Sequence, residues 1–180
     1  MPKPNFLGLG AAKAGTTKMA QLLSQHPQIF MSEPKELHFF DGDGSLGDGS
    51  LDSYLANFKE NIAIGEYTPS YLFVPDAPEA MARLLGTNLK FIVALRNPID
   101  RAYSHHCHAV NNWSARKWQA RGYPVETGTF SAALVEEPAR LASGEYHIRH
   151  QSYFSKGLYA LQLRRFFAHF PRENFVCLPL

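Results

Sequence analysis

Residues Gly10 to Thr17 have the types and spacing of a loop that holds an anion. Two glycines, Gly10 and Gly15, bracket four residues and are followed by a pair of threonines, as in the phosphate-binding sequence GxxxxGK[ST]. Thr16 takes the place of the usual lysine, and Lys13 inside the loop supplies the positive charge instead. Glycines allow the tight turn, and the N–H groups of a following helix attract the anion. A strand-to-helix turn without a ligand is the alternative.

The apolar run KFIVAL, Lys90 to Leu95, is the strand at whose end an ATP or GTP hydrolase would carry a metal-binding acid. Such enzymes hold Mg²⁺ with an aspartate there, but Arg96 follows this run. A metal-assisted phosphoryl transfer is therefore disfavoured, and the residues favour an anionic donor that side chains alone neutralise. A nucleotide kinase that uses the loop for ATP is the first alternative.

The segment RNPIDRAYS, which begins at Arg96, has the signals of a second helix N-terminus. Asn97 is a typical N-cap, Pro98 suits the first helical position, and Asp100 lies where a capping box places its acid. This pattern predicts a strand, a short turn and a helix whose first N–H groups point at a second anion.

Three side chains of this segment have the chemistry to bind a terminal phosphate. Arg96 lies at the end of the strand, and Arg101 and Ser104 lie three residues apart on one helix face. Arginines and a hydroxyl beside free N–H groups suit such a phosphate. The alternative is that the arginines form surface ion pairs with Asp100 or Asp76.

The elements that must position these residues follow the pattern of a parallel sheet covered by helices, because short apolar runs alternate with segments of helical period. The predicted strands are Phe6–Leu9, Ile62–Tyr67, Lys90–Leu95 and Asn174–Leu178. The predicted helices are Thr16–Ser24, Asp76–Leu85, Pro98–Asn111 and Lys156–His169. An α/β domain seldom ends on a core strand, so we expect the domain to continue beyond the last strand.

The composition indicates one globular domain over residues 1–180. The chain is 45% hydrophobic with a net charge of +2, so no global field favours nucleic acid or an anionic membrane. Cys107 and Cys177 lie in apolar segments and are expected to be buried thiols. No apolar run is long enough to span a membrane, and the short MPKP before the first strand leaves no room for a signal peptide. The sequence therefore predicts a cytoplasmic protein.

Four segments, in order along the chain, resemble the sulfotransferases that use 3′-phosphoadenosine-5′-phosphosulfate (PAPS). KAGTT, Lys13–Thr17, resembles the family's 5′-phosphosulfate loop, and RNPIDRAYS, Arg96–Ser104, resembles its 3′-phosphate motif. PKELHFFD, Pro34–Asp41, and GEYTPSYL, Gly65–Leu72, are similar to the carbohydrate branch, typified by heparan sulfate sulfotransferases. The resemblance implies a P-loop-like three-layer α/β/α fold with a central parallel sheet.

The resemblance also implies a reaction. A sulfuryl group moves from PAPS to a hydroxyl or amine of an acceptor, in this branch a carbohydrate, without a metal, and 3′-phosphoadenosine 5′-phosphate (PAP) is released. Lys13 would stabilise the charge that develops on the leaving phosphate. The residues implied for the donor are Lys13, Ala14, Gly15, Thr16, Thr17, Lys18, Arg96 and Ser104.

The proton acceptor is left open between two residues of PKELHFFD. The resemblance points to Glu36 as the general base, whereas a histidine such as His38 has a pKa closer to neutral pH without any help from burial. A salt bridge of Glu36 with Lys35 or Lys13 is the structural alternative. The residues implied near the acceptor are Lys35, His38, Asp41, Thr68, Ser70 and Tyr71.

Two further interpretations remain. His105, His106 and His108 have metal-like spacing, but the segment lacks a third ligand on the helix face and the HExxH glutamate, so zinc is disfavoured. A non-catalytic relative that binds PAP or a polyanion is the other alternative. The basic residues available to it are Arg116, Lys117, Arg121, Arg149, Lys156, Arg164 and Arg165.

Overall fold

The computed structural model describes residues 1–42, 49–111, 116, 119–120, 125–144 and 150–180. These residues form two compact units, of which the first comprises Met1–Leu95 with Tyr159–Leu180 and the second Arg96–Leu158. The prediction of one domain over the whole chain stays a prediction. Three of the basic residues weighed for a polyanion site, Lys117, Arg121 and Arg149, lie outside the described residues.

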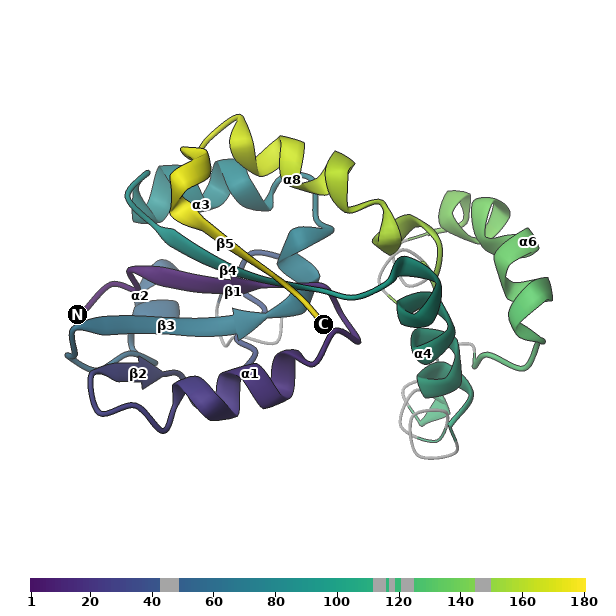
Figure 1. Cartoon of the computed structure of the whole chain (residues 1–180), viewed down its shortest axis with the longest axis horizontal. Coiled ribbons are helices and arrows are strands. Elements are labelled where there is room, and N and C mark those ends of the chain that lie inside the picture. Colours follow the sequence, from purple (N-terminus) through teal and green to yellow (C-terminus); the bar gives the residue numbers. More distant parts are fainter. Residues whose placement is uncertain (43–48, 112–115, 117–118, 121–124, 145–149) are drawn as a thin grey trace. The chain divides into compact units, whose positions relative to one another are not determined.

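The first unit is built on a five-stranded parallel sheet with strand order β2-β3-β1-β4-β5 (Figure 1). The central strand β1 pairs with β3 and β4, so that Phe6 lies opposite both Gly65 and Lys90. All four residues of β1 are buried, which explains its uninterrupted apolar run. The strands are β1 Phe6–Leu9, β2 Ile29–Met31, β3 Ala63–Thr68, β4 Lys90–Leu95 and β5 Phe175–Pro179.

Helices cover both faces of this sheet, which confirms the predicted three-layer α/β/α fold. α3 and α8 lie along one face and α1 lies along the other (Figure 1). Under α8, the ring of Phe91 packs between Phe170 and Phe175, with centroids 4.7 and 4.6 Å away. The helices of this unit are α1 Thr16–Leu23, α2 Leu51–Leu55, the 3₁₀ helix η1 Pro69–Leu72, α3 Ala77–Leu85 and α8 Tyr159–Phe167.

The second unit contains α4 Pro98–Val110, α6 Phe130–Ala142 and the 3₁₀ helix η2 Ser155–Gly157. The predicted N-cap of α4 is confirmed, because the side chain of Asn97 accepts a hydrogen bond from the N–H of Ile99 at 2.9 Å. Arg101 is fully buried, and its guanidinium donates to the carbonyl of Tyr153. Arg101 is thus a core residue of this unit and not the exposed partner of an aspartate.

Most predicted elements are confirmed to within one or two residues, and two expectations are wrong. The helix expected over Lys156–His169 begins only at Tyr159, because the segment Ser155–Gly157 forms a separate 3₁₀ helix. Cys107 and Cys177 are exposed, not buried. Cys107 is on an outer face of α4, and Cys177 is on β5, the edge strand of the sheet, so apolar neighbours in sequence did not imply burial.

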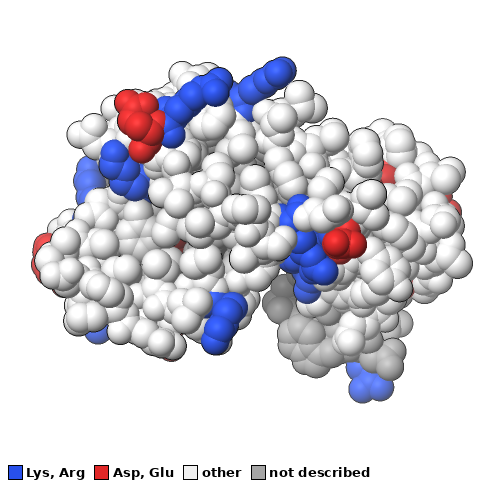
Figure 2. All heavy atoms as spheres, in the orientation of Figure 1, with Lys and Arg blue, Asp and Glu red and all other residues white. Residues whose placement is uncertain are grey.

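Within the described residues, no helix has the length and apolar character needed to cross a membrane. Basic side chains occur at several places on the visible face of the first unit, and an acidic side chain lies among those at its upper edge (Figure 2). That face therefore carries mixed charges and not a field of one sign.

The β1 glycine Gly8 allows a close approach of the buried Tyr67 ring, and replacing it should destabilise the fold. Gly8 lies opposite Tyr67 in the sheet, and a Cβ at Gly8 would lie 2.1 Å from Cγ of that ring. Because the ring is fully buried, Gly8→Ala should lower the free energy of unfolding by about 1–3 kcal/mol or more, as overpacked cores do. Chemical denaturation measures this loss.

The matched control is Gly128→Ala, because the nearest heavy atom to its added Cβ would lie at 3.4 Å, an ordinary contact. This variant should unfold at nearly the wild-type midpoint. Equal midpoints for Gly8→Ala and Gly128→Ala would contradict the packing argument.

Candidate active site

The loop between β1 and α1 is fixed to the neighbouring strand β4. The N–H of Ala11 donates to the carbonyl of Ala94 at 2.5 Å, and the N–H of Ala94 donates to the carbonyl of Gly10 at 2.9 Å. Gly15 has φ of 68°, a left-handed conformation that favours glycine. The loop is therefore held as a defined turn at the carboxyl end of the sheet, where α/β folds bind ligands.

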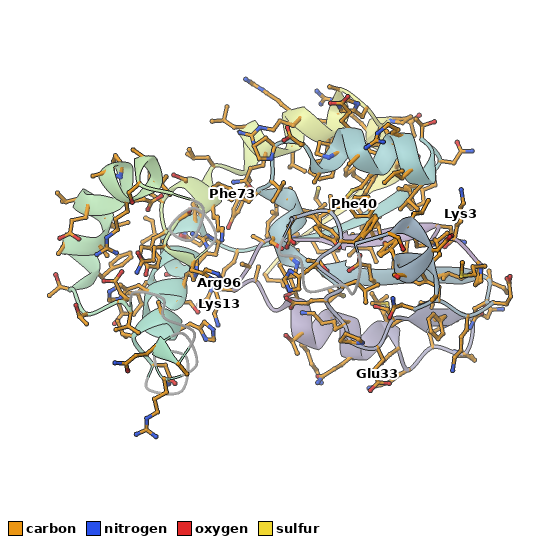
Figure 3. The ribbon with its side chains drawn as sticks, turned by 180° about the vertical axis from the view of Figure 1, so that it is seen from behind. Lys3, Lys13, Glu33, Phe40, Phe73 and Arg96 are labelled. Carbon is orange, nitrogen blue, oxygen red and sulfur yellow. The ribbon has the colours of Figure 1, made fainter. Side chains whose placement is uncertain are left out.

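The first turn of α1 presents the donors of a predicted anion site. The N-cap is Gly15, which has no side chain to cap the first N–H groups, and both Gly15 and Thr17 are exposed. Lys13 lies in the loop that leads into this turn (Figure 3). Of the other predicted donor residues, Ala14 and Thr16 are buried and Lys18 is exposed. The helix N-terminus and Lys13 can together neutralise an anion.

The segment that carries Glu36 follows β2 in the chain and is hydrogen-bonded to the carboxyl end of β3. The N–H of Tyr67 donates to the carbonyl of Lys35 at 3.2 Å, and the N–H of Leu37 donates to Oγ1 of Thr68 at 3.1 Å. This segment also meets α1, because Nζ of Lys35 donates to Oγ1 of Thr17 at 3.4 Å. The structure thus brings the predicted base region to the N-terminal turn of α1.

Four charged side chains and one hydroxyl form a chain of contacts in this segment. Nζ of Lys35 lies 2.6 Å from Oε1 of Glu36, and Oε2 of Glu36 lies 3.4 Å from Nε2 of His38. The other ring nitrogen of His38, Nδ1, lies 2.6 Å from Oδ2 of Asp41. The hydroxyl of Ser70 donates to the same oxygen of Asp41. We call Lys35, Glu36, His38, Asp41 and Ser70 the charged cluster.

The contacts of the charged cluster set the protonation states of its two candidate bases. Burial lowers the pKa of His38, but the hydrogen bonds and charges of Asp41 and Glu36 outweigh burial and raise this pKa from 6.5 to about 10. Burial raises the pKa of Glu36, but His38 and Lys35 outweigh it and hold this pKa below 4.5. At neutral pH, therefore, His38 is an imidazolium and Glu36 is a carboxylate that can accept a proton.

The raised pKa of His38 makes a prediction for stability. A group whose pKa is higher in the folded state stabilises the fold fully below its ordinary value, and this contribution is lost as the pH rises through the folded value. The free energy of unfolding should therefore fall between pH 6.5 and about pH 10 on account of His38. Urea unfolding across this interval measures the fall.

The comparison variant for this prediction is His38→Asn, because His38 has φ of 55° and asparagine tolerates the left-handed region. Its stability should decline less over the same interval. An equal decline in both proteins would contradict the assignment of an imidazolium at His38.

The structure places the remaining predicted site residues in two groups. Thr68 and Tyr71 have no exposed surface, and their hydroxyls bond within the protein. Their predicted place beside the acceptor stays a prediction, and the contacts that they make support the Glu36 segment. Arg96 lies two residues before the start of α4 and Ser104 lies within it, both in the second unit and partly buried. Their assignment to the 3′-phosphate also stays a prediction.

Sequence reasoning missed Glu66, a fully buried carboxylate of β3. Its Oε1 accepts hydrogen bonds from the hydroxyls of Tyr54, at 3.1 Å, and Tyr71, at 2.7 Å. Burial raises the pKa of Glu66, against the hydrogen bonds that lower it. The signal that could have found it was an acid inside a strand otherwise composed of uncharged residues.

Among the described residues, no group of three or more His, Cys, Asp or Glu side chains is placed to hold a metal ion. His105 and His106 are buried in the second unit, where Nε2 of His106 lies 3.0 Å from the carbonyl oxygen of Gly128. His106 therefore has a hydrogen-bond partner within its own unit.

Comparison with known proteins identifies relatives in sequence, although no family model matches the chain. A membrane-associated sulfotransferase of Dictyostelium discoideum is 33% identical over 121 residues, which cover 63% of this chain and 24% of that protein. A bifunctional heparan sulfate N-deacetylase/N-sulfotransferase of Caenorhabditis elegans is 28% identical over 153 residues, or 82% of this chain and 18% of that protein. The chain thus spans less than a quarter of the length of these curated relatives.

Comparison with solved structures gives a match over nearly the whole chain. The crystal structure of a sulfotransferase from Alicyclobacillus acidocaldarius superposes with a TM-score of 0.81 at 30% sequence identity. The match covers 99% of this chain and 74% of that one. The similarity therefore includes both the sheet and the segments that carry the candidate site.

Proposed function

Because the chain belongs to the sulfotransferase family, we propose that it moves a sulfuryl group from PAPS to a hydroxyl or amine of an acceptor. The observation that carries the proposal is the contact of Lys35 with Thr17, which joins the N-terminal turn of α1 to the charged cluster. A donor phosphosulfate at this turn would lie beside a carboxylate able to take a proton. The groups that stabilise the charge of the donor would thus lie beside the carboxylate that accepts the proton of the acceptor.

On the donor side, Lys13 and the N–H groups of the α1 turn bind the 5′-phosphosulfate. Transfer breaks the bond between sulfur and the bridging phosphate oxygen, and negative charge collects on that oxygen as PAP leaves. A positive side chain and a helix N-terminus fixed before the reaction stabilise this charge without reorganisation. Since Arg96 and not an acid follows β4, we expect transfer without added Mg²⁺.

On the acceptor side, Glu36 is the general base. The acceptor oxygen or nitrogen forms the new bond to sulfur, and its proton passes to the Glu36 carboxylate. The imidazolium of His38 lies between Glu36 and Asp41 and fixes the orientation of the base, while Lys35 pairs with the other carboxylate oxygen. A low pKa keeps Glu36 ionised and ready to accept a proton, although it limits the strength of the base.

For the acceptor we propose a carbohydrate. Support comes from the heparan sulfate N-sulfotransferase among the relatives in sequence and from the segments PKELHFFD and GEYTPSYL. The open face of the charged cluster, where the Glu36 side chain is 37% exposed, gives such an acceptor access to the base.

The test is an activity assay with PAPS and desulfated heparan sulfate in the presence of EDTA. Mass spectrometry should detect PAP together with a sulfated sugar, and omission of either substrate should abolish the product. In a parallel assay without EDTA, phosphorylated product from ATP and Mg²⁺ would instead support the kinase alternative. Binding of heparin by the folded protein without any dependence on PAPS or PAP would support the non-catalytic alternative.

A further inference from the structure

We propose that Glu66 is a positioning residue whose buried carboxylate, acting through Thr68 and Tyr71, holds the backbone of residues 37–39 and thereby places Glu36. The inference rests on the proposed function of Glu36 as a base. It assigns a role to a side chain that contacts neither the α1 turn nor the exposed part of the charged cluster.

The Glu66 carboxylate is the centre of a dense set of hydrogen bonds. Its Oε1 accepts from the hydroxyls of Tyr54 and Tyr71, and its Oε2 accepts from the hydroxyl of Thr68 and from the N–H of Leu37 at 3.2 Å. A fully buried carboxylate is costly unless hydrogen bonds replace its water. Four donors, from α2, β3, η1 and the segment that carries Glu36, meet this requirement, and the carboxylate thereby joins these parts of the chain.

Two of the three hydroxyls that donate to Glu66, those of Thr68 and Tyr71, also accept hydrogen bonds from the loop. Oγ1 of Thr68 accepts from the N–H of Leu37 at 3.1 Å and from the N–H of His38 at 3.5 Å. The hydroxyl of Tyr71 accepts from the N–H of Phe39 at 2.9 Å. Three successive backbone N–H groups, those of residues 37–39, therefore donate to Glu66 or to hydroxyls that Glu66 orients.

These bonds hold a backbone conformation that the loop would not choose by itself. His38 has φ of 55°, in the left-handed region that residues other than glycine adopt uncommonly, although asparagine, aspartate and histidine do so more often than the rest. In this conformation the two nitrogens of the imidazole face Glu36 and Asp41. Loss of the hydrogen bonds would let His38 return to a common conformation and would separate it from at least one carboxylate.

Aromatic packing holds the next residues of the loop by a separate contact. The ring of Phe39 stacks on Tyr54 with centroids 4.5 Å apart, and the buried ring of Phe40 (Figure 3) meets Tyr54 and Tyr71 edge to face. The ring of Tyr54 thus supports the loop, whereas among the described residues its hydroxyl bonds to Glu66 alone. The hydroxyl of Tyr71 accepts a hydrogen bond from the N–H of Phe39, whereas the hydroxyl of Tyr54 bonds to Glu66 and not to the loop backbone.

This difference provides a matched pair of variants, Tyr71→Phe and Tyr54→Phe. Each removes one hydroxyl donor from Oε1 of Glu66 and keeps the ring, but only Tyr71 also accepts from the N–H of Phe39. Tyr71→Phe should lower kcat by about 10-fold or more, since small misplacements of catalytic groups can cost about 100-fold. Tyr54→Phe should lower kcat clearly less than Tyr71→Phe, since its hydroxyl does not touch the loop.

A readout that needs no acceptor is the NMR titration of the His38 imidazole. In the wild type and in Tyr54→Phe its pKa should stay near 10, and in Tyr71→Phe it should fall towards the ordinary value of 6.5. Glu66→Gln, which preserves size, is the second variant and should shift the His38 titration in the same direction. PAP affinity, measured by calorimetry, should be unchanged in all three variants.

An unshifted His38 titration in both Tyr71→Phe and Glu66→Gln would overturn the positioning role, as would equal effects of Tyr71→Phe and Tyr54→Phe. If the folded wild type neither binds PAP nor transfers sulfuryl groups, the proposed function fails, and the NMR comparison still decides whether Glu66 holds the loop. The two failures are therefore distinguishable.

Discussion

Glu36→Gln is expected to lower kcat for sulfuryl transfer by about 100- to 10,000-fold, the usual contribution of a general base. An amide of the same size cannot take the acceptor proton, and it also loses the charge that holds the imidazolium of His38. Because Glu36 does not belong to the α1 turn, PAP affinity should change little. Steady-state kinetics with PAPS and calorimetry with PAP measure the two quantities.

The control for this prediction is Glu33→Gln in the same segment of chain (Figure 3). Glu33 is exposed and lies three residues before Glu36, so its amide variant should retain wild-type kcat. If Glu36→Gln kept kcat within about 3-fold of wild type, too little for loss of a general base, Glu36 would not be the proton acceptor.

Lys13→Ala is expected to weaken PAP binding by about 1.5–3 kcal/mol, the usual contribution of a hydrogen bond to a charged group. This loss corresponds to about a 10- to 150-fold increase in Kd. The reason is that Lys13 is the basic side chain of the loop that leads into the α1 turn. Calorimetric titration of both proteins with PAP measures the difference, and kcat with PAPS should fall as well.

The control for Lys13 is Lys3→Ala, because Lys3 precedes β1 and Lys13 follows it (Figure 3). Both variants lose one positive charge, so a difference between them reports position and not net charge. Salt titration adds a second check, since a charge-dependent contact weakens as ionic strength rises. Equal PAP affinity in Lys13→Ala and Lys3→Ala would remove Lys13 from the donor site.

The sheet was largely predictable because its strands are buried on both faces. β1 and β4 were predicted to the residue, since their apolar runs end in clear turn or charge signals. β2 was missed because its three residues, Ile29–Met31, are too few for a periodic pattern. α6 was missed because Pro138 lies inside it, a residue that in sequence argues against a helix.

The candidate site was predictable in its residue types but not in its protonation states. The pattern PKELHFFD drew attention to Glu36 and His38, yet which of them can accept a proton depends on neighbours brought together by the fold. The contact of His38 with Asp41 occurs together with a left-handed backbone conformation at His38. Nothing in the sequence marks that turn, since a positive φ is uncommon for any residue other than glycine, even for histidine, which is among the enriched types.

The role of Glu66 could not be predicted from the sequence for a different reason. Its importance arises from donors that lie at separate places in the sequence, Tyr54 on α2, Tyr71 on η1 and the N–H of Leu37. A single acid in a strand has no pattern that identifies such partners. The predicted cytoplasmic location and the single domain over residues 1–180 remain predictions.

The most direct test of the account is calorimetric titration of the wild-type chain with PAP in the presence of EDTA, and with ATP in parallel titrations that contain either EDTA or Mg²⁺. A PAP site at the α1 turn predicts binding without metal, and binding that Lys13→Ala weakens and Lys3→Ala does not. A folded protein that fails to bind PAP, or that binds ATP in preference and only with Mg²⁺, would contradict the account.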